Sequence, residues 1–244
     1  MIAADGVGST TRAAIGITDK PEPTGMAIWR IATPRPASVT RTDLAHGGPA
    51  YIAGYCPTSE NTIYAYLVEA CRDRAAVDPA AYADEMHRLA QGYGGAWPRS
   101  PRTSPTRRRS NYTWFERLLV EGSWHRGRVV LIGDAAHCCP PTLAQGAAMS
   151  LEDALVLAEL LTSGKDWGDE LFQAYYDRRI PRVRTIVVEA SVQIGQWQLD
   201  GVRDADMPGL IGRTLTPSRS ARDRHRVLRT DDRRPRPPPS PGGR

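Results

Sequence analysis

The ten residues from Arg128 to His137, Arg-Val-Val-Leu-Ile-Gly-Asp-Ala-Ala-His, constrain the fold more than any other stretch. Residues 129–132 are an unbroken apolar and mostly β-branched run, which predicts a strand buried on both faces of an α/β sheet. Gly133 and Asp134 then predict a turn. From residue 143 to residue 161, apolar side chains fall on nearly every side of a helical wheel, which predicts a largely buried helix. The unit is therefore a strand, a loop and a helix.

The loop of this unit is a predicted ligand site. Sites in open parallel sheets lie beyond the carboxyl ends of the strands, where a helix N-terminus offers free amides and a positive dipole. Asp134 lies at that edge, and its carboxylate can accept hydrogen bonds from sugar-like hydroxyls. Gly146, Ala147 and Ala148 have side chains small enough for a flat ligand to approach the backbone amides, and this combination suits a flavin. The alternative is a strand-to-helix turn that Asp134 merely caps, but a cap does not require the later spacing of Pro and Gly.

This spacing resembles that of a known family. Gly133-Asp-Ala-Ala-His, three residues, Pro141, four residues, Gly146 and then Glu152-Asp-Ala-Leu-Val-Leu-Ala look like the second flavin signature of class A FAD-dependent monooxygenases. These are the aromatic and polyketide hydroxylases similar to p-hydroxybenzoate hydroxylase. The resemblance implies that Asp134 hydrogen-bonds the ribityl chain of FAD and that the amides of residues 146–148 face the pyrimidine end of the flavin. It implies cofactor-binding positions for Gly133, Pro141 and Gln145 as well.

The first twelve residues resemble a second motif of the same family. They predict a short apolar strand that runs into a turn, and Asp5, Gly6, Ser9 and Arg12 match the family's Asp-Gly motif, with Ala3 in place of its first glycine. In the family this motif lies near both FAD and the passing nicotinamide cofactor. The resemblance therefore implies cofactor-binding roles for Asp5, Gly6 and Arg12. The family places its two motifs well over a hundred residues apart, and here Asp5 and Asp134 are separated by 129 residues.

The family's G-x-G-x-x-G sequence, which binds the FAD pyrophosphate, has no counterpart in this chain. Gly6-x-Gly8 lacks the third glycine, and the glycine cluster at residues 92–97 fails the spacing. We therefore expect the chain to be the C-terminal portion of a monooxygenase that begins inside a strand. The absent strands would leave an unpaired sheet edge and an incomplete cofactor site. A separate N-terminal chain that supplies the FAD-binding unit is a candidate partner.

The predicted fold class is α/β with mixed α+β character: an incomplete FAD-binding Rossmann-like domain with an inserted antiparallel β-sheet substrate domain and C-terminal helices. Residues 1–18 are predicted to be a remnant of the FAD-binding domain, and residues 19–110 the antiparallel sheet with a covering helix. Residues 111–212 are predicted to hold the Gly-Asp motif and the C-terminal helices. Residues 213–244 are predicted to form a disordered Pro/Arg-rich tail.

Three runs with strand-like composition predict the antiparallel sheet, namely residues 25–32, 50–56 and 62–68. Residues 78–90, which begin with Asp78 and Pro79, predict an amphipathic helix that covers it, and residues 97–110 an exposed linker. In the C-terminal part, Pro181 is predicted to interrupt a helix that Asp169 caps. Four aromatic side chains could face an aromatic substrate or could pack in the sheet's own covering layer, and we favour the second for any single one: Trp29, Tyr51, Tyr64 and Tyr66.

Charge and composition exclude several classes of protein. The formal net charge is +5, but residues 213–244 carry ten arginines and three aspartates, which leaves about −2 for the rest of the chain. The tail lacks aromatic residues between its arginines, so we predict no nucleic-acid binding. No apolar stretch is long enough for a membrane span and no signal sequence opens the chain, so a cytoplasmic location is expected. The four cysteines and five histidines show no metal-ligand spacing, so no metal is predicted.

The resemblance implies an FAD-dependent, NADH- or NADPH-driven monooxygenase, in which reduced flavin and O2 place one oxygen on a small aromatic or polyketide-like substrate. FAD carries the chemistry, and we assign no catalytic residue. His137 could act as a base, but a histidine in a structural turn is more often hydrogen-bonded to the backbone than catalytic. Two alternatives stay open: a non-catalytic remnant or interaction module with an incomplete FAD site, and a flavin oxidoreductase that does not insert oxygen.

Overall fold

The computed structural model describes residues 1–73, 77–94, 97, 110–164, 166–202 and 204–215. The chain divides into two compact units, Met1–Ala205 and Asp206–Arg244. The described part of the second unit is Asp206 and helix α6 (Met207–Leu215), so the first three residues of the predicted tail are helical. The rest of that tail, and the predicted linker apart from Trp97 and Ser110, lie outside the described residues.

The first unit contains a small sheet built around the apolar run at residues 129–132. Strand β8 (Val129–Leu131) pairs in parallel with β1 (Ile2–Ala3) and antiparallel with β7 (His125–Arg126), in the order β1-β8-β7. Val130 and Leu131 are buried, which confirms the predicted buried strand. The parallel pair places the ends of β1 and β8 at the same edge, so the turns that follow the two strands are neighbours.

A six-stranded antiparallel sheet accounts for most of residues 22–119. Its order is β3-β4-β5-β2-β6-β9, and its strands are β2 (Glu22–Pro34), β3 (Asp43–His46), β4 (Ile52–Pro57), β5 (Thr62–Ala70), β6 (Ser110–Leu119) and β9 (His137–Cys138). The three predicted strands are confirmed, and β3 is additional. Because β9 follows the Gly-Asp turn directly, the pairing of β6 with β9 joins this sheet to the predicted flavin motif.

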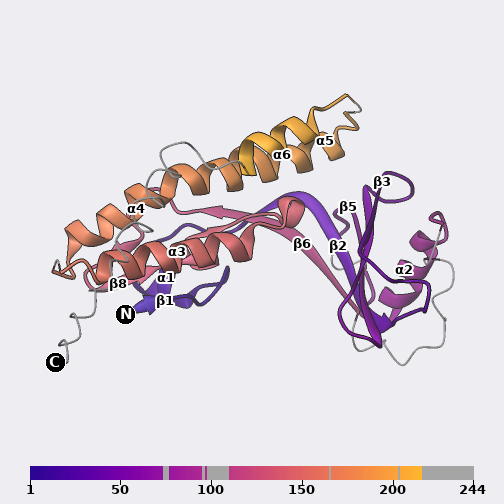
Figure 1. Ribbon diagram of the computed structural model, residues 1–244, viewed down its shortest axis with the longest axis horizontal. Coiled ribbons are helices and arrows are strands. Elements are labelled where there is room, and N and C mark those ends of the chain that lie inside the picture. The colour runs from indigo at the N-terminus through magenta and orange to yellow at the C-terminus, as the bar shows by residue number, and fades with distance from the viewer. Residues whose placement is uncertain (74–76, 95–96, 98–109, 165, 203, 216–244) are drawn as a thin grey trace, which may run out of the picture. The chain divides into compact units, whose positions relative to one another are not determined.

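Helix α2 (Tyr82–Ala90) covers one face of the six-stranded sheet, as predicted (Figure 1). A short 3-10 helix (Pro79–Ala81) precedes it, and the Asp78 carboxylate caps that turn by accepting from the amide of Ala80. Trp29 is fully buried under this layer, with its ring centroid 5.5 Å from that of Tyr82. For Trp29 the favoured interpretation, packing in the covering layer, is therefore confirmed. Tyr51 and Tyr66 instead contact the apolar cluster of the opposite face.

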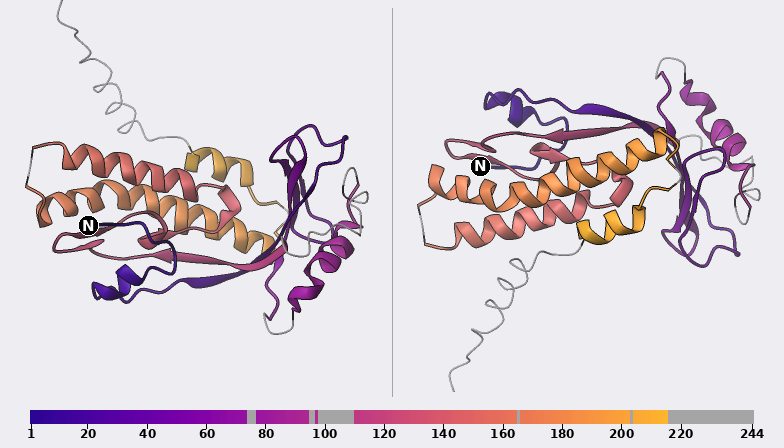
Figure 2. Two further views of the ribbon diagram at one scale, coloured as in Figure 1. Left: turned by 90° about the horizontal axis from the view of Figure 1, so that it is seen from below. Right: turned by 90° about the horizontal axis from the view of Figure 1, so that it is seen from above.

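The remaining helices follow the Gly-Asp turn. Helices α3 (Gly146–Leu161) and α4 (Asp169–Arg184) run side by side in opposite directions (Figure 2). The predicted interruption at Pro181 is wrong, because α4 passes through Pro181 and continues as a π-helical segment (Thr185–Val192) and then as α5 (Gln193–Leu199). Buried Val183, Ile186 and Val187 hold this stretch in place, so packing outweighs the hydrogen bond that proline removes.

Helix α3 is less buried than its sequence predicts. Only three of its residues are buried, Met149, Asp153 and Leu157, which recur every four residues on one stripe. Leu151 and Leu155 are 67% and 70% exposed. The prediction failed because an apolar helical wheel shows which faces can be buried, whereas the neighbours decide which face is. Across the described ranges, no helix has both the length and the apolar character needed to span a bilayer.

Candidate functional site

The Gly133-Asp134 turn follows β8 and forms a single 3-10 turn (Gly133–Ala135). Gly133 has a φ of +58°, a conformation that favours glycine, and a Cβ there would lie 2.6 Å from the Ser150 hydroxyl oxygen. Only a residue without a side chain therefore fits between the strand and α3. This close approach sets Asp134 beside the first turns of the helix.

The carboxylate of Asp134 is half-buried and accepts no hydrogen bond from any residue that the structure describes. Burial raises its pKa above the ordinary value, and the nearby His137 acts in the opposite direction. A carboxylate is an obligate hydrogen-bond acceptor, and leaving one partly desolvated without a donor costs free energy. Asp134 is therefore available to a ligand that brings hydroxyl or amide donors.

The N-terminus of α3 is uncapped. The side chain of the N-cap residue Gln145 makes no capping hydrogen bond, because its amide nitrogen donates to the Leu143 carbonyl oxygen at 3.3 Å. The first turn of α3 contains no acidic residue. Within the described residues, the amides of residues 146–148 have no acceptor. Free amides and the positive end of the helix dipole suit an electron-rich ligand edge. Donor groups at the helix and an acceptor at Asp134 therefore match a flavin, which offers both.

The loop between the Gly-Asp turn and α3 is held in place by contacts of its residues with other segments of the chain. Pro141 is exposed and opens a 3-10 turn (Pro141–Leu143) whose last residue is buried, and the Thr142 hydroxyl donates to the Ser191 carbonyl oxygen at 2.8 Å. Ala144 then adopts a left-handed φ of 52°, which turns the chain into the helix. A Cβ at Gly146 would lie 3.8 Å from the Cys139 sulfur. The loop therefore returns to the segment that follows Asp134.

Cys139 shows that Asp134 and the helix start are close in space. Burial raises the pKa of the Cys139 thiol to about 11, and the charge of Asp134 adds to the shift. Since Cys139 also faces Gly146, these three residues form one cluster at the edge of the sheet. Both adjacent cysteines are free thiols, and burial raises the pKa of Cys138 to about 12.

The carboxylate of Asp5 is occupied within its own motif. It accepts from the Ser9 hydroxyl at 2.6 Å and from the Thr11 amide at 3.0 Å, and Ser9 in turn caps helix α1 (Thr10–Ala14) by accepting from the Arg12 amide. The hydrogen bond from Ser9 is the main reason that its pKa is lowered to about 2. Gly6, at a φ of +81°, makes the turn. Asp5 thus organises the turn, and its predicted contact with a cofactor stays a prediction.

Arg12 joins the two motifs. Its buried guanidinium donates to three carbonyl oxygens, those of Val7 at 2.9 Å, Asp19 at 3.1 Å and Ala135 at 2.9 Å. Ala135 belongs to the Gly-Asp turn, so the side chain links segments 123 residues apart. Because these contacts use all three guanidinium nitrogens, Arg12 supports the site from within the protein.

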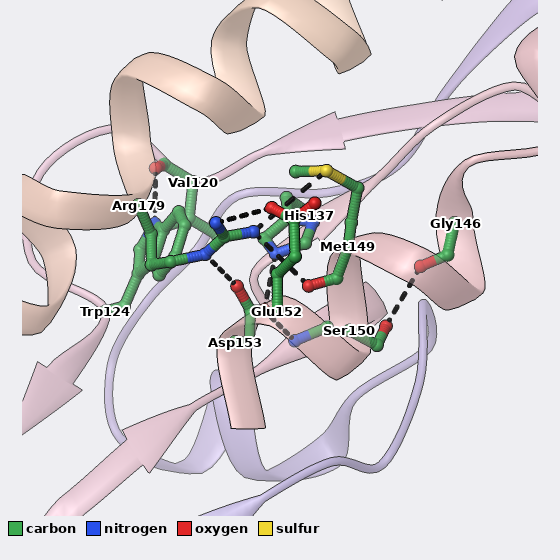
Figure 3. A network of polar contacts seen from close by, with 10 residues as sticks. Val120, Trp124, His137, Gly146, Met149, Ser150, Glu152, Asp153 and Arg179 are labelled. Atoms are coloured by element: carbon green, nitrogen blue, oxygen red, sulfur yellow. Dashed lines mark hydrogen bonds and ion pairs between the residues drawn. The ribbon is translucent and has the colours of Figure 1, made fainter. Parts of the chain in front are cut away.

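A fully buried carboxylate, Asp153 of α3, holds the Gly-Asp turn from behind (Figure 3). Its Oδ2 atom accepts from the Gly133 amide at 2.7 Å and lies 2.7 Å from His137 Nε2, and its Oδ1 atom accepts from Arg179 Nε at 2.6 Å. Arg179 also donates to Glu152 at 2.8 Å. Burial alone would raise the pKa of Asp153, but His137 and Arg179 hold it below its ordinary value. The network fixes the backbone that carries Asp134.

His137 belongs to this network. The ionised carboxylate of Asp153 only accepts hydrogen bonds, so the Nε2 atom of His137 carries the proton. The imidazole is 2% exposed and its ring lies 5.2 Å from that of Trp124. A buried ring held in this way is part of the turn, as expected, but its partner is the Asp153 carboxylate and not the backbone.

Sequence reasoning assigned no role to Asp153 or Arg179. A signal was present, because Asp153 lies between Met149 and Leu157 at four-residue spacing, on the stripe that α3 buries. A charged residue in a buried stripe requires a buried partner. The partner, 26 residues later on α4, could not be identified without knowing that α3 and α4 are adjacent.

Comparisons with known proteins identify the family of this chain. The family described as FAD binding domain matches residues 1–190. A putative FAD-dependent monooxygenase of Bacillus subtilis, YetM, is 34% identical over 189 residues, which cover 75% of this chain and 49% of the relative. The 2-heptyl-3-hydroxy-4(1H)-quinolone synthase of Pseudomonas aeruginosa is 30% identical, with 81% of this chain and 52% of the relative covered. The chain therefore spans about half the length of the curated relatives it matches.

Solved structures show the same fold. HpxO of Klebsiella pneumoniae, in complex with FAD and uric acid, superposes with a TM-score of 0.70 at 20% sequence identity, over 87% of this chain and 58% of that one. At this identity the likeness concerns the fold. Mixed helices and antiparallel strands in the arrangement of a flavin hydroxylase confirm the predicted fold class.

Proposed function

Because this chain belongs to the FAD-binding-domain family of FAD-dependent monooxygenases, we propose that its Gly-Asp turn and the start of α3 hold the ribityl chain and the pyrimidine edge of FAD. The observation that supports this most is the half-buried carboxylate of Asp134, which has no donor among the described residues. Ribityl hydroxyls are donors of the kind that such a carboxylate accepts. The uncapped amides of residues 146–148 suit the electron-rich pyrimidine edge.

Each proposed cofactor residue has a distinct task. Asp134 orients the ribityl chain, and Gly133 lets the turn approach α3. Pro141 and Gln145 shape the loop that ends at the free amides of the helix. Asp5, Gly6 and Arg12 support the adjoining turn, and we propose that this turn borders the cofactor.

The proposed reaction is the insertion of one oxygen atom from O2 into a small aromatic or polyketide-like substrate, with NADH or NADPH as reductant. FAD, when bound, supplies the hydride and oxygen chemistry. The protein holds the flavin by its ribityl chain. Strand β9, which follows the Gly-Asp turn, pairs with β6 and so links this site to the six-stranded sheet. We propose that residues 19–110 form the substrate domain, and that residues 1–18 and 111–212 form the flavin side.

Flavin titration of the 244-residue chain tests the proposal. We expect saturable quenching of flavin fluorescence, lost or weakened in Asp134→Ala. Because the sequence has no G-x-G-x-x-G motif for the pyrophosphate, riboflavin should bind nearly as well as FAD. A chain that ignores both flavins would contradict the proposal and favour the non-catalytic alternative.

Two further measurements address the remaining alternatives. With NADH or NADPH and an aromatic substrate, hydroxylated product supports a monooxygenase, whereas release of hydrogen peroxide alone supports an oxidoreductase without oxygen insertion. A separate chain that supplies the G-x-G-x-x-G unit stays a prediction. Adding such a chain should raise the affinity for FAD over that for riboflavin, and an unchanged ratio would contradict it.

A further inference from the structure

The π-helical segment Thr185–Val192 differs from the regular α-helices on either side of it. Segments of π-helix are rare in proteins, and they occur frequently at functional sites. Four residues of this segment are buried, and three of them are apolar, namely Ile186, Val187 and Ala190. The fourth is Ser191, which is therefore the polar member of the buried face.

The hydroxyl of Ser191 is buried without a partner. The residue is 0% exposed, and its Oγ atom has no hydrogen bond within the described part of the chain. In an α-helix a serine hydroxyl can donate to the carbonyl oxygen four residues earlier. Because buried polar groups are normally paired, the irregular geometry of this segment lowers stability. Local features that lower stability are expected where they serve a functional site.

The backbone of Ser191, by contrast, contacts the loop of residues 140–145, which leads from β9 to α3. The Thr142 hydroxyl donates to the Ser191 carbonyl oxygen at 2.8 Å and so joins segments 49 residues apart. Among the residues that the structure describes, this is the one hydrogen bond between the loop and any segment other than the loop itself and α3. The loop is therefore anchored at Thr142.

A short and tightly turned piece of chain connects the anchor to the free amides of α3. The amide of Ala144 donates to the Pro141 carbonyl oxygen at 3.0 Å, and Ala144 has a left-handed φ of 52°. Leu143, between Thr142 and Ala144, is buried. Because these contacts leave the backbone few alternative conformations, the position of Thr142 determines where the chain enters α3 at Gly146.

We propose that Thr142 is a positioning residue for the flavin, because its hydrogen bond to the Ser191 carbonyl oxygen holds the amides of residues 146–148 toward the pyrimidine edge. This inference rests on the proposed function, which assigns those amides to FAD. It adds a role for the π-helical segment, which contributes no side chain to the proposed flavin site. The segment presents a backbone carbonyl to the loop and thereby sets the geometry of the helix start.

Riboflavin titration of the whole chain and three threonine variants tests the proposal. Thr142→Val removes the donor and should weaken binding about 3- to 10-fold, the range of one neutral hydrogen bond. Thr142→Ser keeps the hydroxyl and should restore most of the affinity. Thr162→Val is the matched control, because the Thr162 hydroxyl also donates to a carbonyl oxygen, that of Ala158 at 2.9 Å, at the other end of α3. Equal affinity in Thr142→Val and the wild-type chain would overturn the proposal.

Ser191→Ala distinguishes the carbonyl of this residue from its hydroxyl. The substitution leaves the backbone carbonyl in place, so the variant should bind riboflavin as the wild-type chain does. Its melting temperature should equal or exceed that of the wild-type chain, because a buried hydroxyl without a partner is removed. A loss of affinity as large as that in Thr142→Val would overturn the assignment, since it would identify the hydroxyl as the group that matters.

Amide hydrogen exchange of the flavin-free chain separates this proposal from the proposed function. The amides of Ala144 and Met149 donate to the carbonyl oxygens of Pro141 and Gln145, within the loop and the first turn of α3. In Thr142→Val both amides should exchange about 3- to 10-fold faster than in the wild-type chain and in Thr142→Ser. Faster exchange in a chain that binds no riboflavin would contradict only the proposed function. Unchanged exchange, with riboflavin bound normally by Thr142→Val, would contradict only the positioning role.

Discussion

Asp134 and Asp153 are two carboxylates of the same strand, loop and helix, and their environments are opposite. Asp153 is fully buried and meets Gly133, His137 and Arg179, and its pKa is lowered. Asp134 is half-buried and meets no donor in the described part of the chain, and its pKa is raised. The comparison shows that one carboxylate fixes the turn so that the other can stay free.

The difference follows from the free energy needed to bury each of the two carboxylates. A buried carboxylate is tolerated only when charges and donors compensate it, and Asp153 has both. A partly desolvated carboxylate without a partner lowers stability, which is the usual consequence of preorganising a ligand site. Arg12 adds to the rigidity by joining the Asp5 turn to the Asp134 turn. The following changes test the contrast, from the largest expected effect to the smallest.

Asp153→Ala should lower the free energy of unfolding by about 3 to 5 kcal/mol, because Arg179 and His137 are left buried without their carboxylate. Urea denaturation measures this loss. Asp134→Ala is the matched control and should unfold at or above the wild-type urea concentration. Equal losses of unfolding free energy in the two variants would contradict the contrast between Asp153 and Asp134.

Leu157→Ala should cost about 2 to 5 kcal/mol, since Leu157 is 2% exposed on the stripe of α3 that contains Asp153. Leu155→Ala, two residues away and 70% exposed, should change stability by less than about 0.5 kcal/mol. Both are measured by urea denaturation of the same chain. Similar losses at the two positions would show that the second face of α3 is covered in solution.

Asp134→Ala should weaken flavin binding by about 1.5 to 3 kcal/mol, the range for a hydrogen bond to a charged group. Fluorescence titration with riboflavin measures the change. Asp153→Asn is a useful companion, because its effect on binding should appear together with a loss of stability, whereas that of Asp134→Ala should not. Unchanged affinity in Asp134→Ala would remove Asp134 from the site.

Asp5 is the intermediate case, a carboxylate with partners that lies at the surface. Its pKa of about 2 is below the ordinary 3.8, so it contributes stability above pH 3.8, and this contribution is lost as the pH falls through 2. The effect should be small because the group is exposed. Between pH 5 and pH 2, the free energy of unfolding should fall slightly more for the wild-type chain than for Asp5→Asn. An equal fall in the two chains would show that Ser9 does not stabilise the ionised carboxylate of Asp5.

Local patterns in the sequence predict much of this fold. The buried strand β8, the antiparallel strands and α2 follow from short-range periodicity and capping, and all are present. The position of Asp134 beside the start of α3 also follows from the spacing of Gly133, Pro141 and Gly146. These contacts are close along the chain, so spacing is informative.

What the sequence does not predict depends on contacts between distant segments. The partner of Asp153 is Arg179, and the link from Arg12 reaches Ala135 across 123 residues. The exposed face of α3 and the passage of α4 through Pro181 depend on neighbours in the same way. Periodicity identifies a face, but only the tertiary structure shows what lies against it.

Carboxyl 13C NMR of Asp134, recorded over a pH titration with and without riboflavin, tests the central claim most directly. In the free chain the pKa of Asp134 should lie above 3.8, because the group is partly desolvated and has no donor. With riboflavin bound the pKa should fall, since the ribityl hydroxyls donate to the ionised form. An unchanged Asp134 pKa in a chain saturated with riboflavin would contradict the account.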